Sequence, residues 1–128
     1  MERLISLGIG YLFGIFQTAY IYGRMNGIDI REHGSGNAGT TNALRVLGKK
    51  AGIIVLLGDV AKTVLAVVAV RVLFHRQDAD WLPLLGMYAA AGAILGHNYP
   101  AQLGFKGGKG IACTAGLVLT LGPIVTAL

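Results

Sequence analysis

Residues His33–Asn42 (HGSGNAGTTN) combine closely spaced glycines with short polar side chains, a pattern suited to holding an anion. Glycines allow the backbone to turn so that several N–H groups point into one concavity, where an anion binds. Arg45 follows and has a guanidinium that can bind a phosphate in bidentate fashion. A flexible turn between two helices would have the same composition, so this segment alone leaves both interpretations open. The candidate anion-binding residues are Gly34, Ser35, Gly36, Asn37, Gly39, Thr40, Thr41 and Asn42.

A second basic and glycine-rich segment, Phe105–Ile111 (FKGGKGI), opens a further apolar run. The N–H groups at the start of a helix attract a phosphate, and Lys106 and Lys109 would add positive charge. The segment is not a Walker A loop, because Leu103 stands at the first glycine position and Gly110 replaces the hydroxyl residue that meets magnesium. An ATPase is therefore disfavoured. Anchoring at a membrane surface explains the two lysines equally well.

Several ionisable residues lie in or at the edge of apolar runs, where such side chains are rare. His97 stands near the second glycine-rich segment and could act as a base, as a hydrogen-bond donor or as a cap for its own helix. Asp59 and Lys62 lie on one face of a helix, about 13 Å into the apolar run. They form either a structural ion pair or part of a site. A nucleophilic Ser35–His33 pair is disfavoured, because side chains so close in sequence rarely face each other productively.

The elements that carry these residues are apolar enough to be membrane helices. Of 128 residues, 54% are apolar and 13% are charged, whereas soluble domains carry about 25% charged residues. The mean hydropathy is +0.62. This composition argues against a soluble or disordered chain and predicts an all-α integral membrane protein with one domain, residues 1–128. A span needs roughly 20 apolar residues, so there is room for four membrane helices. They are expected at about 4–22, 51–74, 82–96 and 111–128.

The net charge of +5 lies mostly in the segments between the apolar runs. In a soluble protein it would suggest a nucleic-acid partner, but basic residues beside membrane spans favour an anionic ligand or the membrane surface instead. Residues 24–50 hold five basic residues and residues 97–110 hold two, whereas the turn 75–80 holds one. The positive-inside rule therefore places both glycine-rich loops in the cytoplasm. The single cysteine, Cys113, excludes an internal disulfide and a cysteine-based zinc site, and no metal is expected.

Taken together, the two glycine-rich segments resemble a known family. Gly34–Arg45 (GSGNAGTTNALR) and His97–Gly110 (HNYPAQLGFKGGKG) are similar to the first and second motifs of the bacterial acyl-phosphate:glycerol-3-phosphate acyltransferases, the PlsY family. The likeness runs through residues 11–123, with the order and spacing of the motifs intact. It includes residues 27–33 (GIDIREH), ahead of the first motif.

The chain departs from the family pattern at a few positions. Gln17 and Thr18 stand where the family often has Ile-Pro-Phe. Thr40 replaces a frequent alanine, and Cys113 replaces a frequent threonine. The family has seven membrane helices and a third cytoplasmic motif, which the four apolar runs do not supply. Since the last run continues to Leu128 without a polar tail, the chain is expected to be a fragment, the N-terminal part of the family fold.

The resemblance implies transfer of a fatty acyl group from acyl phosphate to the 1-hydroxyl of glycerol 3-phosphate, which yields lysophosphatidate and phosphate in phospholipid biosynthesis. It implies a multi-pass protein of the bacterial inner (plasma) membrane that binds lipid, with no cofactor, no metal and no acyl-enzyme. The implied catalytic residues are Ser35, Arg45 and His97. The implied phosphate-binding residues of the second motif are Lys106, Gly107, Gly108, Lys109 and Gly110, with Asp59 and Lys62 in support.

Two other functions stay open. A small membrane transporter or channel for phosphorylated solutes would use the same anion-binding loops without chemistry. An inactive fragment that lacks the third motif would have a purely structural role. Solute uptake into vesicles distinguishes the first from an acyltransferase, and restored acyl transfer on supplying the third motif distinguishes the second.

Overall fold

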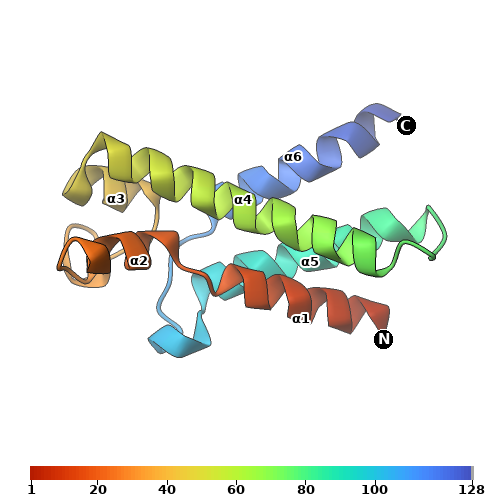
Figure 1. The fold of residues 1–128 in the computed structure, drawn as a ribbon, viewed down its shortest axis with the longest axis horizontal. Coiled ribbons are helices and arrows are strands. Elements are labelled where there is room, and N and C mark those ends of the chain that lie inside the picture. Colours follow the sequence, from red (N-terminus) through yellow and green to blue (C-terminus); the bar gives the residue numbers. More distant parts are fainter. Residues whose placement is uncertain (128) are drawn as a thin grey trace.

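The computed structural model describes residues 1–127, and in this part of the chain all regular structure is helical. The long helices run side by side along the molecule, and the short ones gather toward one end (Figure 1). The elements are α1 (Glu2–Gly14), α2 (Thr18–Met25), the short 3-10 helix η1 (Ile30–Glu32), α3 (Thr40–Leu47), α4 (Lys49–Leu73), α5 (Trp81–Asn98), the 3-10 helix η2 (Ala101–Leu103) and α6 (Ile111–Ala127).

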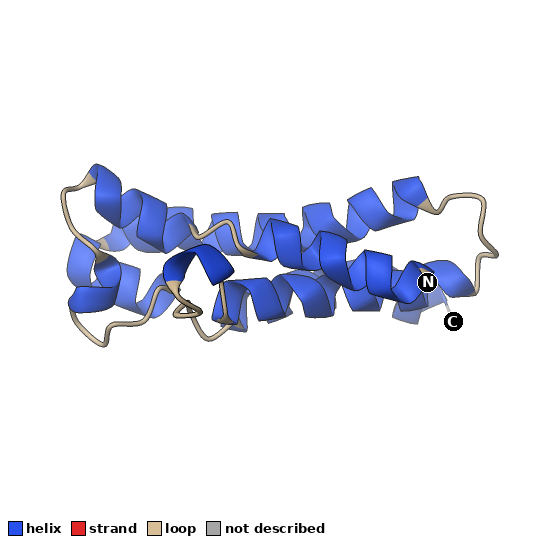
Figure 2. Cartoon of the chain, turned by 90° about the horizontal axis from the view of Figure 1, so that it is seen from below, coloured by secondary structure: helices blue, strands red, loops and turns tan. Residues whose placement is uncertain are grey.

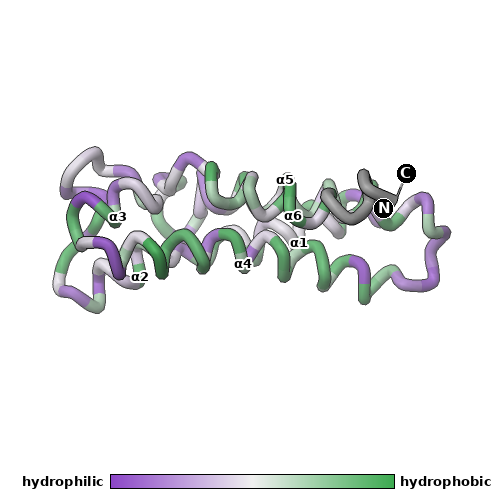
Figure 3. Tube along the Cα trace, turned by 90° about the horizontal axis from the view of Figure 1, so that it is seen from above, coloured by the Kyte–Doolittle hydropathy of each residue, from purple (hydrophilic) through white to green (hydrophobic). Residues whose placement is uncertain are grey.

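Helices α1, α4, α5 and α6 form an elongated bundle (Figure 2). α1 packs along most of α5, and α4 packs against both α5 and α6. The core between α4 and α5 is built from small and branched apolar side chains, among them Ala66, Val70, Leu85 and Ala89. Hydrophilic residues concentrate at the two ends of the bundle, whereas the long helices are largely hydrophobic (Figure 3). This distribution is typical of helices that lie in a bilayer.

The contact between α1 and α5 depends on four glycines. Gly10 and Gly14 on α1 and Gly92 and Gly96 on α5 face the backbone of the opposite helix. A Cβ atom at any of the four would overlap a main-chain atom of that neighbour. In a membrane, where lipid competes for apolar surface, small residues four apart let helix backbones approach and gain van der Waals contact. This close contact fixes the end of α5, which carries His97, against the end of α1.

Among the described residues, two stretches of helix are long and apolar enough to cross a membrane. They are Glu2–Met25, which contains α1 and α2, and Lys49–Leu73, which is α4. Large apolar side chains are exposed along α4, including Ile53, Leu57 and Leu65, where they would contact lipid. The spans predicted at 82–96 and 111–128 are not established by this test, so the count of four stays a prediction.

The apolar run predicted at 4–22 is not one regular helix. α1 ends at Gly14, the chain is irregular through Gln17, and α2 begins at Thr18. The buried amide of Gln17 explains the break, because its Nε2 donates to the carbonyl oxygens of Gly96 at 3.3 Å and His97 at 3.1 Å. A polar side chain held in this way ties the interruption to the end of α5.

The two glycine-rich loops are found toward the same end of the bundle, away from the N-terminus and from the turn between α4 and α5 (Figure 1). The first loop, residues 26–39, connects α2 to α3 and contains η1. The second loop, residues 99–110, connects α5 to α6 and contains η2. Because α5 continues to Asn98, His97 lies in the last turn of a helix and not in the predicted loop 97–110. This placement gives the histidine a fixed backbone.

Candidate functional site

The first loop is organised by one buried side chain, Asn42 in α3. Its Nδ2 group donates to the carbonyl oxygens of Ile30 at 3.3 Å, His33 at 2.9 Å and Asn37 at 3.0 Å. Its Oδ1 accepts from the N–H of Ser35 at 3.0 Å. These contacts use both amide protons and the amide oxygen. Asn42, which the residue pattern suggests for anion binding, therefore shapes the loop by its own hydrogen bonds.

Two glycines allow the turn that surrounds Ser35. Gly34 and Gly36 have φ angles of +57° and +77°, in the left-handed region that residues with a Cβ atom rarely adopt. A Cβ atom at Gly34 would also overlap Oδ1 of Asn42. The Ser35 side chain is exposed, and its Oγ accepts from the N–H of Asn37 at 3.3 Å. The hydroxyl proton of Ser35 therefore points away from this bond and is free to meet a ligand.

The second loop folds back on the end of α5 through backbone hydrogen bonds. The N–H of Gly107 donates to the carbonyl oxygen of Asn98 at 3.1 Å, and that of Gly108 donates to His97 at 3.1 Å. A Cβ atom at Gly108 would overlap Nε2 of the His97 ring and would lie 2.9 Å from the carbonyl oxygen of Ala38 in the first loop. The absence of a side chain at Gly108 therefore lets both loops and His97 meet at one point.

A cavity of about 220 Å³ lies where these parts meet, next to the N-terminus of α6. Its walls come from both glycine-rich loops, from α4 and from α5. Apolar side chains such as Leu56 and Ile111 complete the lining. The polar and glycine residues that line it are Asn37, Gly39, Thr40, Thr41, Asp59, His97, Lys109 and Gly110.

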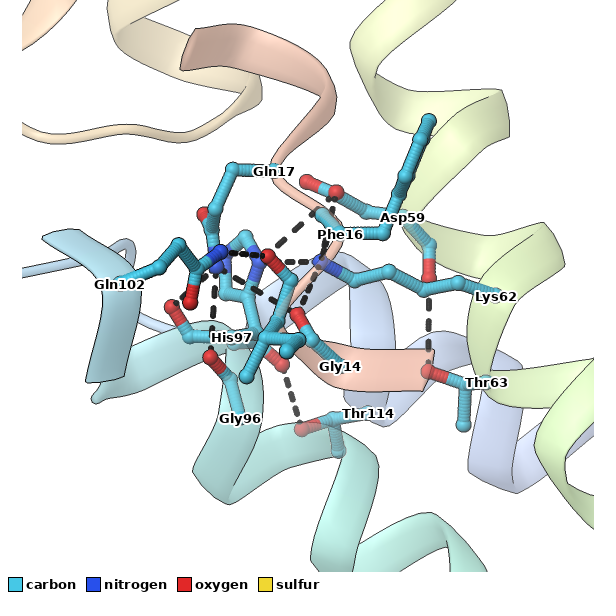
Figure 4. Close-up of polar contacts among 12 residues, drawn as sticks. Gly14, Phe16, Gln17, Asp59, Lys62, Thr63, Gly96, His97, Gln102 and Thr114 are labelled. Atoms are coloured by element: carbon cyan, nitrogen blue, oxygen red, sulfur yellow. Dashed lines mark hydrogen bonds and ion pairs between the residues drawn. The ribbon is translucent and has the colours of Figure 1, made fainter. Parts of the chain in front are cut away.

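Asp59 and His97 in the cavity wall belong to a buried polar cluster, whose contacts Figure 4 shows. The ammonium of Lys62 donates to the carbonyl oxygens of Gly14 at 3.0 Å and Phe16 at 2.7 Å, at the break between α1 and α2. The same ammonium lies 2.8 Å from Nδ1 of His97 and 3.3 Å from Oδ1 of Asp59. The spacing of Asp59 and Lys62 thus produces the expected ion pair, and the pair also contacts His97.

Some predicted site residues lie outside the cavity walls. Ser35, Arg45 and Lys106 are exposed, on the first loop, on α3 and on the second loop. The N–H groups of Gly107 and Gly108 are engaged within the protein. In the part of the chain that the structure describes, no three His, Cys, Asp or Glu side chains gather closely enough to hold a metal ion. The structure thus brings the two motifs together but divides their residues between cavity walls and outer surface.

Comparison with known proteins identifies the family to which this chain belongs. The family model of glycerol-3-phosphate acyltransferase matches residues 4–128. The chain belongs to the glycerol-3-phosphate acyltransferase family. It is 46% identical to the glycerol-3-phosphate acyltransferase of Crocosphaera subtropica over 123 residues, which cover 91% of the chain and 57% of that relative. It is also 46% identical to the enzyme of the same name from Clostridioides difficile, with 96% of the chain and 60% of the relative covered.

Two solved structures of the family are similar to this fold. Both are crystal structures of PlsY (YgiH), an integral membrane glycerol 3-phosphate acyltransferase. The glycerol 3-phosphate form matches with a TM-score of 0.80 and 33% identity, over 99% of this chain and 61% of PlsY. The lysophosphatidic acid form matches with a TM-score of 0.75 and 34% identity, over 99% and 60%. The chain therefore spans about three fifths of the length of these relatives.

These matches confirm the family predicted from the two motifs, and they confirm an all-helical membrane protein. The roles of single site residues, the number of spans and the side of the membrane on which the loops lie are still predictions.

One contact between the two loops could not be predicted from the sequence. Arg31 of the first loop donates through Nη1 to the carbonyl oxygen of Leu103 in the second loop at 2.9 Å. Arg31, just ahead of the first motif, thus links the first loop directly to the second motif.

Asp29 holds the Arg31 side chain in this linking position. Its carboxylate accepts from Nε of Arg31 at 3.0 Å and from Nη2 at 2.8 Å. The hydrogen-bonded guanidinium lowers the pKa of Asp29 below its ordinary value of 3.8. The sequence signal for this pair was an aspartate two residues before an arginine, within the family-like segment 27–33. Such a short pattern is common in turns, and it does not show that the arginine reaches a loop far away in sequence.

Proposed function

We propose that this chain carries the first two motifs of an acyl-phosphate:glycerol-3-phosphate acyltransferase. In the proposed reaction the 1-hydroxyl oxygen of glycerol 3-phosphate bonds to the carbonyl carbon of acyl phosphate, and the bond from that carbon to the phosphate oxygen breaks. The phosphate that leaves takes up the hydroxyl proton, so the products are lysophosphatidate and inorganic phosphate. The observation that carries the proposal is the shared cavity, which residues from both glycine-rich loops line together with Asp59 and His97. The similarity to PlsY in its glycerol 3-phosphate form supports the same substrate here.

The proposed chemistry requires two phosphate groups close to one carbonyl carbon. Two dianions about 8 Å apart repel by roughly 8 kcal/mol at an effective dielectric constant of about 20. Lys109 at the cavity and the N-terminus of α6 supply positive potential there. Arg45 and Lys106, on neighbouring exposed surface, would bind the parts of the substrates that extend out of the cavity. Because acyl phosphate is already an activated anhydride, proximity and charge neutralisation account for the catalysis without a covalent nucleophile.

The roles proposed for the first motif follow from which hydrogen-bonding groups each side chain does not already use within the protein. The exposed Ser35 hydroxyl donates to a phosphate or carbonyl oxygen, and the Arg45 guanidinium binds a phosphate with two parallel hydrogen bonds. Gly34 and Gly36 act by allowing the turn, and Asn42 acts by holding it. In the second motif, Gly107 and Gly108 place the loop against α5, and Lys109 and Gly110 face the ligand.

The acyl chain is proposed to lie against the outside of the bundle. A groove of about 520 Å³ between α1 and α4 is lined mainly by apolar side chains, including Leu12, Phe16 and Leu65. Lys62 also borders this groove, so the groove lies next to the buried polar cluster. A chain in the groove would lie in the lipid phase with its head group near His97.

The proposed location is the bacterial inner membrane, with four spans and both glycine-rich loops in the cytoplasm. The common placement of the two loops toward one end of the bundle supports a common side of the membrane. Their basic residues favour the cytoplasmic side. A cysteine introduced at Gly36 should resist a membrane-impermeant thiol reagent in intact cells, and one at Asp78 should react. The reverse labelling would contradict this orientation.

The activity is tested with a chimera, because the chain covers about three fifths of its relatives. The chimera continues this chain with the part of the Clostridioides difficile relative that lies beyond the matched region. Membranes that contain it should convert labelled glycerol 3-phosphate and acyl phosphate into lysophosphatidate, releasing one phosphate per product, with or without a metal chelator. Arg45→Lys should remove most activity, since an ammonium lacks the planar fork, and Lys50→Ala should not. A chimera without acyltransferase activity, in an assay in which the full-length relative is active, would overturn the proposal.

A further inference from the structure

We propose that Lys62 is a positioning residue that holds His97 in the Nε2–H tautomer, so that the imidazole acts in the cavity as a hydrogen-bond donor and not as a base. The inference rests on the proposed function for the identity of the substrate. Its structural part, the tautomer of His97, is independent of that function. The choice between donor and base cannot be read from the sequence, because His97 and Lys62 are 35 residues apart.

The three protons of the Lys62 ammonium each have an acceptor. Two are directed at the carbonyl oxygens of Gly14 and Phe16, and the third at Nδ1 of His97, 2.8 Å away. An ammonium has donors and no lone pair, so in this contact Nδ1 must be the acceptor. A proton on Nδ1 would point at a proton on Nζ. The neutral ring therefore carries its single proton on Nε2.

The break between α1 and α2 makes this arrangement specific. In a continuous helix, the carbonyl oxygens of Gly14 and Phe16 would accept from backbone N–H groups one turn later. At the break they face Lys62 instead, and their two hydrogen bonds fix the direction of the third proton. Gln17 holds the same break to the backbone of His97. The interruption and the histidine are therefore positioned together.

Asp59 balances the charge of the ammonium without competing for His97. Its Oδ1 lies 3.3 Å from Nζ of Lys62 and 3.7 Å from Nδ1 of His97. The second distance is too long for a hydrogen bond, so Asp59 does not draw a proton onto Nδ1. All three side chains are buried, and a buried ammonium without a counter-charge would be strongly destabilising. The pair thus keeps Lys62 charged beside a neutral imidazole.

The other side of the imidazole reaches the ligand. His97 lines the cavity, and Nε2 faces Gly108, where any side chain would overlap it. An Nε2–H group at this place can donate to an anionic oxygen of a substrate, such as a phosphate oxygen or the oxygen of the acyl carbonyl as it gains charge. It has no lone pair with which to remove a proton from a hydroxyl group.

The test is nitrogen-15 NMR of the chain labelled at histidine and reconstituted in lipid vesicles. His33→Gln and His75→Gln variants identify the signals of His97. We expect a protonated Nε2 and an unprotonated Nδ1 that accepts a hydrogen bond. Lys62→Met should shift the Nδ1 signal and produce a mixture of tautomers, whereas Lys62→Arg should largely keep the Nε2–H form. Lys50→Met, at the exposed start of the same helix, is the matched control and should leave the spectrum unchanged.

Kinetics in the active chimera provide the second readout. Lys62→Met should lower kcat by about 10- to 100-fold with little change in KM, as expected for a lost transition-state donor. An Nδ1–H tautomer in the unsubstituted chain would overturn the proposal, and this measurement needs no variant that folds poorly. An unchanged spectrum in a folded Lys62→Met variant would also overturn it. A chimera without acyltransferase activity but with the expected tautomer would contradict the proposed function and leave the positioning role of Lys62 supported.

Discussion

The two glycine-rich loops resemble each other in composition but are held in place by different means. One buried amide, that of Asn42, ties the first loop together through four hydrogen bonds. At Gly107 and Gly108 the second loop is held by its backbone, through N–H groups that donate to the carbonyl oxygens of Asn98 and His97, and side chains such as Arg31 and Tyr11 hold its earlier part. The first loop should therefore be sensitive to loss of a side chain, and the second to gain of one.

The largest effect is expected when the first loop loses its central side chain. Asn42→Ala would remove three donated hydrogen bonds and one accepted bond, and would leave the carbonyl oxygen of Asn37 and the N–H of Ser35 without their partner. We expect a loss of about 3 kcal/mol or more in the free energy of unfolding. Thermal unfolding in detergent micelles, followed by circular dichroism, measures it. Asn26→Ala, which removes one exposed hydrogen bond to Tyr22, is the control and should cost well under half as much.

The second largest effect is a loss of activity when the second loop gains even the smallest side chain, a methyl group. In the chimera, Gly108→Ala would place a methyl group against the His97 ring and near the carbonyl oxygen of Ala38. We expect kcat/KM to fall by about 10- to 100-fold, because the histidine donor is blocked or displaced. Gly8→Ala, at a helical glycine with open space around it, should leave activity unchanged. Near-normal activity of Gly108→Ala would show that the second loop can move to accommodate a methyl group. It would contradict the expectation that this loop is sensitive to an added side chain.

A smaller effect sharpens the comparison within the first loop. Gly36→Ala would put a Cβ atom at a φ of +77° and 3.0 Å from the carbonyl oxygen of Arg31. Gly27→Ala has almost the same φ, +78°, but open space around it. Both should lose about 1 kcal/mol of stability from the left-handed backbone, and Gly36→Ala should lose more. Equal losses of stability in the two variants, measured by thermal unfolding, would mean that only the backbone conformation, and not the contact with Arg31, makes Gly36 necessary.

The smallest effect is expected at the link between the loops. The pKa of Asp29 is lowered in the folded chain, so its carboxylate stabilises the fold, and this stabilisation is complete at pH values above the ordinary pKa of 3.8. This contribution is lost as the pH falls through the lowered pKa. Asp29→Asn should therefore reduce stability at neutral pH by about 1 kcal/mol or less, and the difference from the unsubstituted chain should vanish in strong acid. A difference that stays constant into strong acid, or that grows in acid, would contradict this assignment.

The sequence by itself determined the class of protein and the family, and it predicted an approximate place for the site. Composition and apolar runs indicate a membrane protein, and two motifs in order identify the family, because both signals are local properties of the chain. The helical spacing of Asp59 and Lys62 was also sufficient to predict their pairing, since residues three apart share a helix face.

Only the tertiary structure decided which motif residues line the cavity and which hold the loops. Nothing in the local pattern distinguishes Asn42, whose amide is used within the first loop, from Asn37, which lines the cavity. Besides Asp59, the partners of Lys62 lie 35 to 48 residues away, at His97 in α5 and at the break between α1 and α2, which apolar periodicity does not reveal. The physical reason is that a buried donor or acceptor must be satisfied by whatever group packing brings within about 3 Å. That choice depends on the arrangement of the whole bundle and not on neighbours in the sequence.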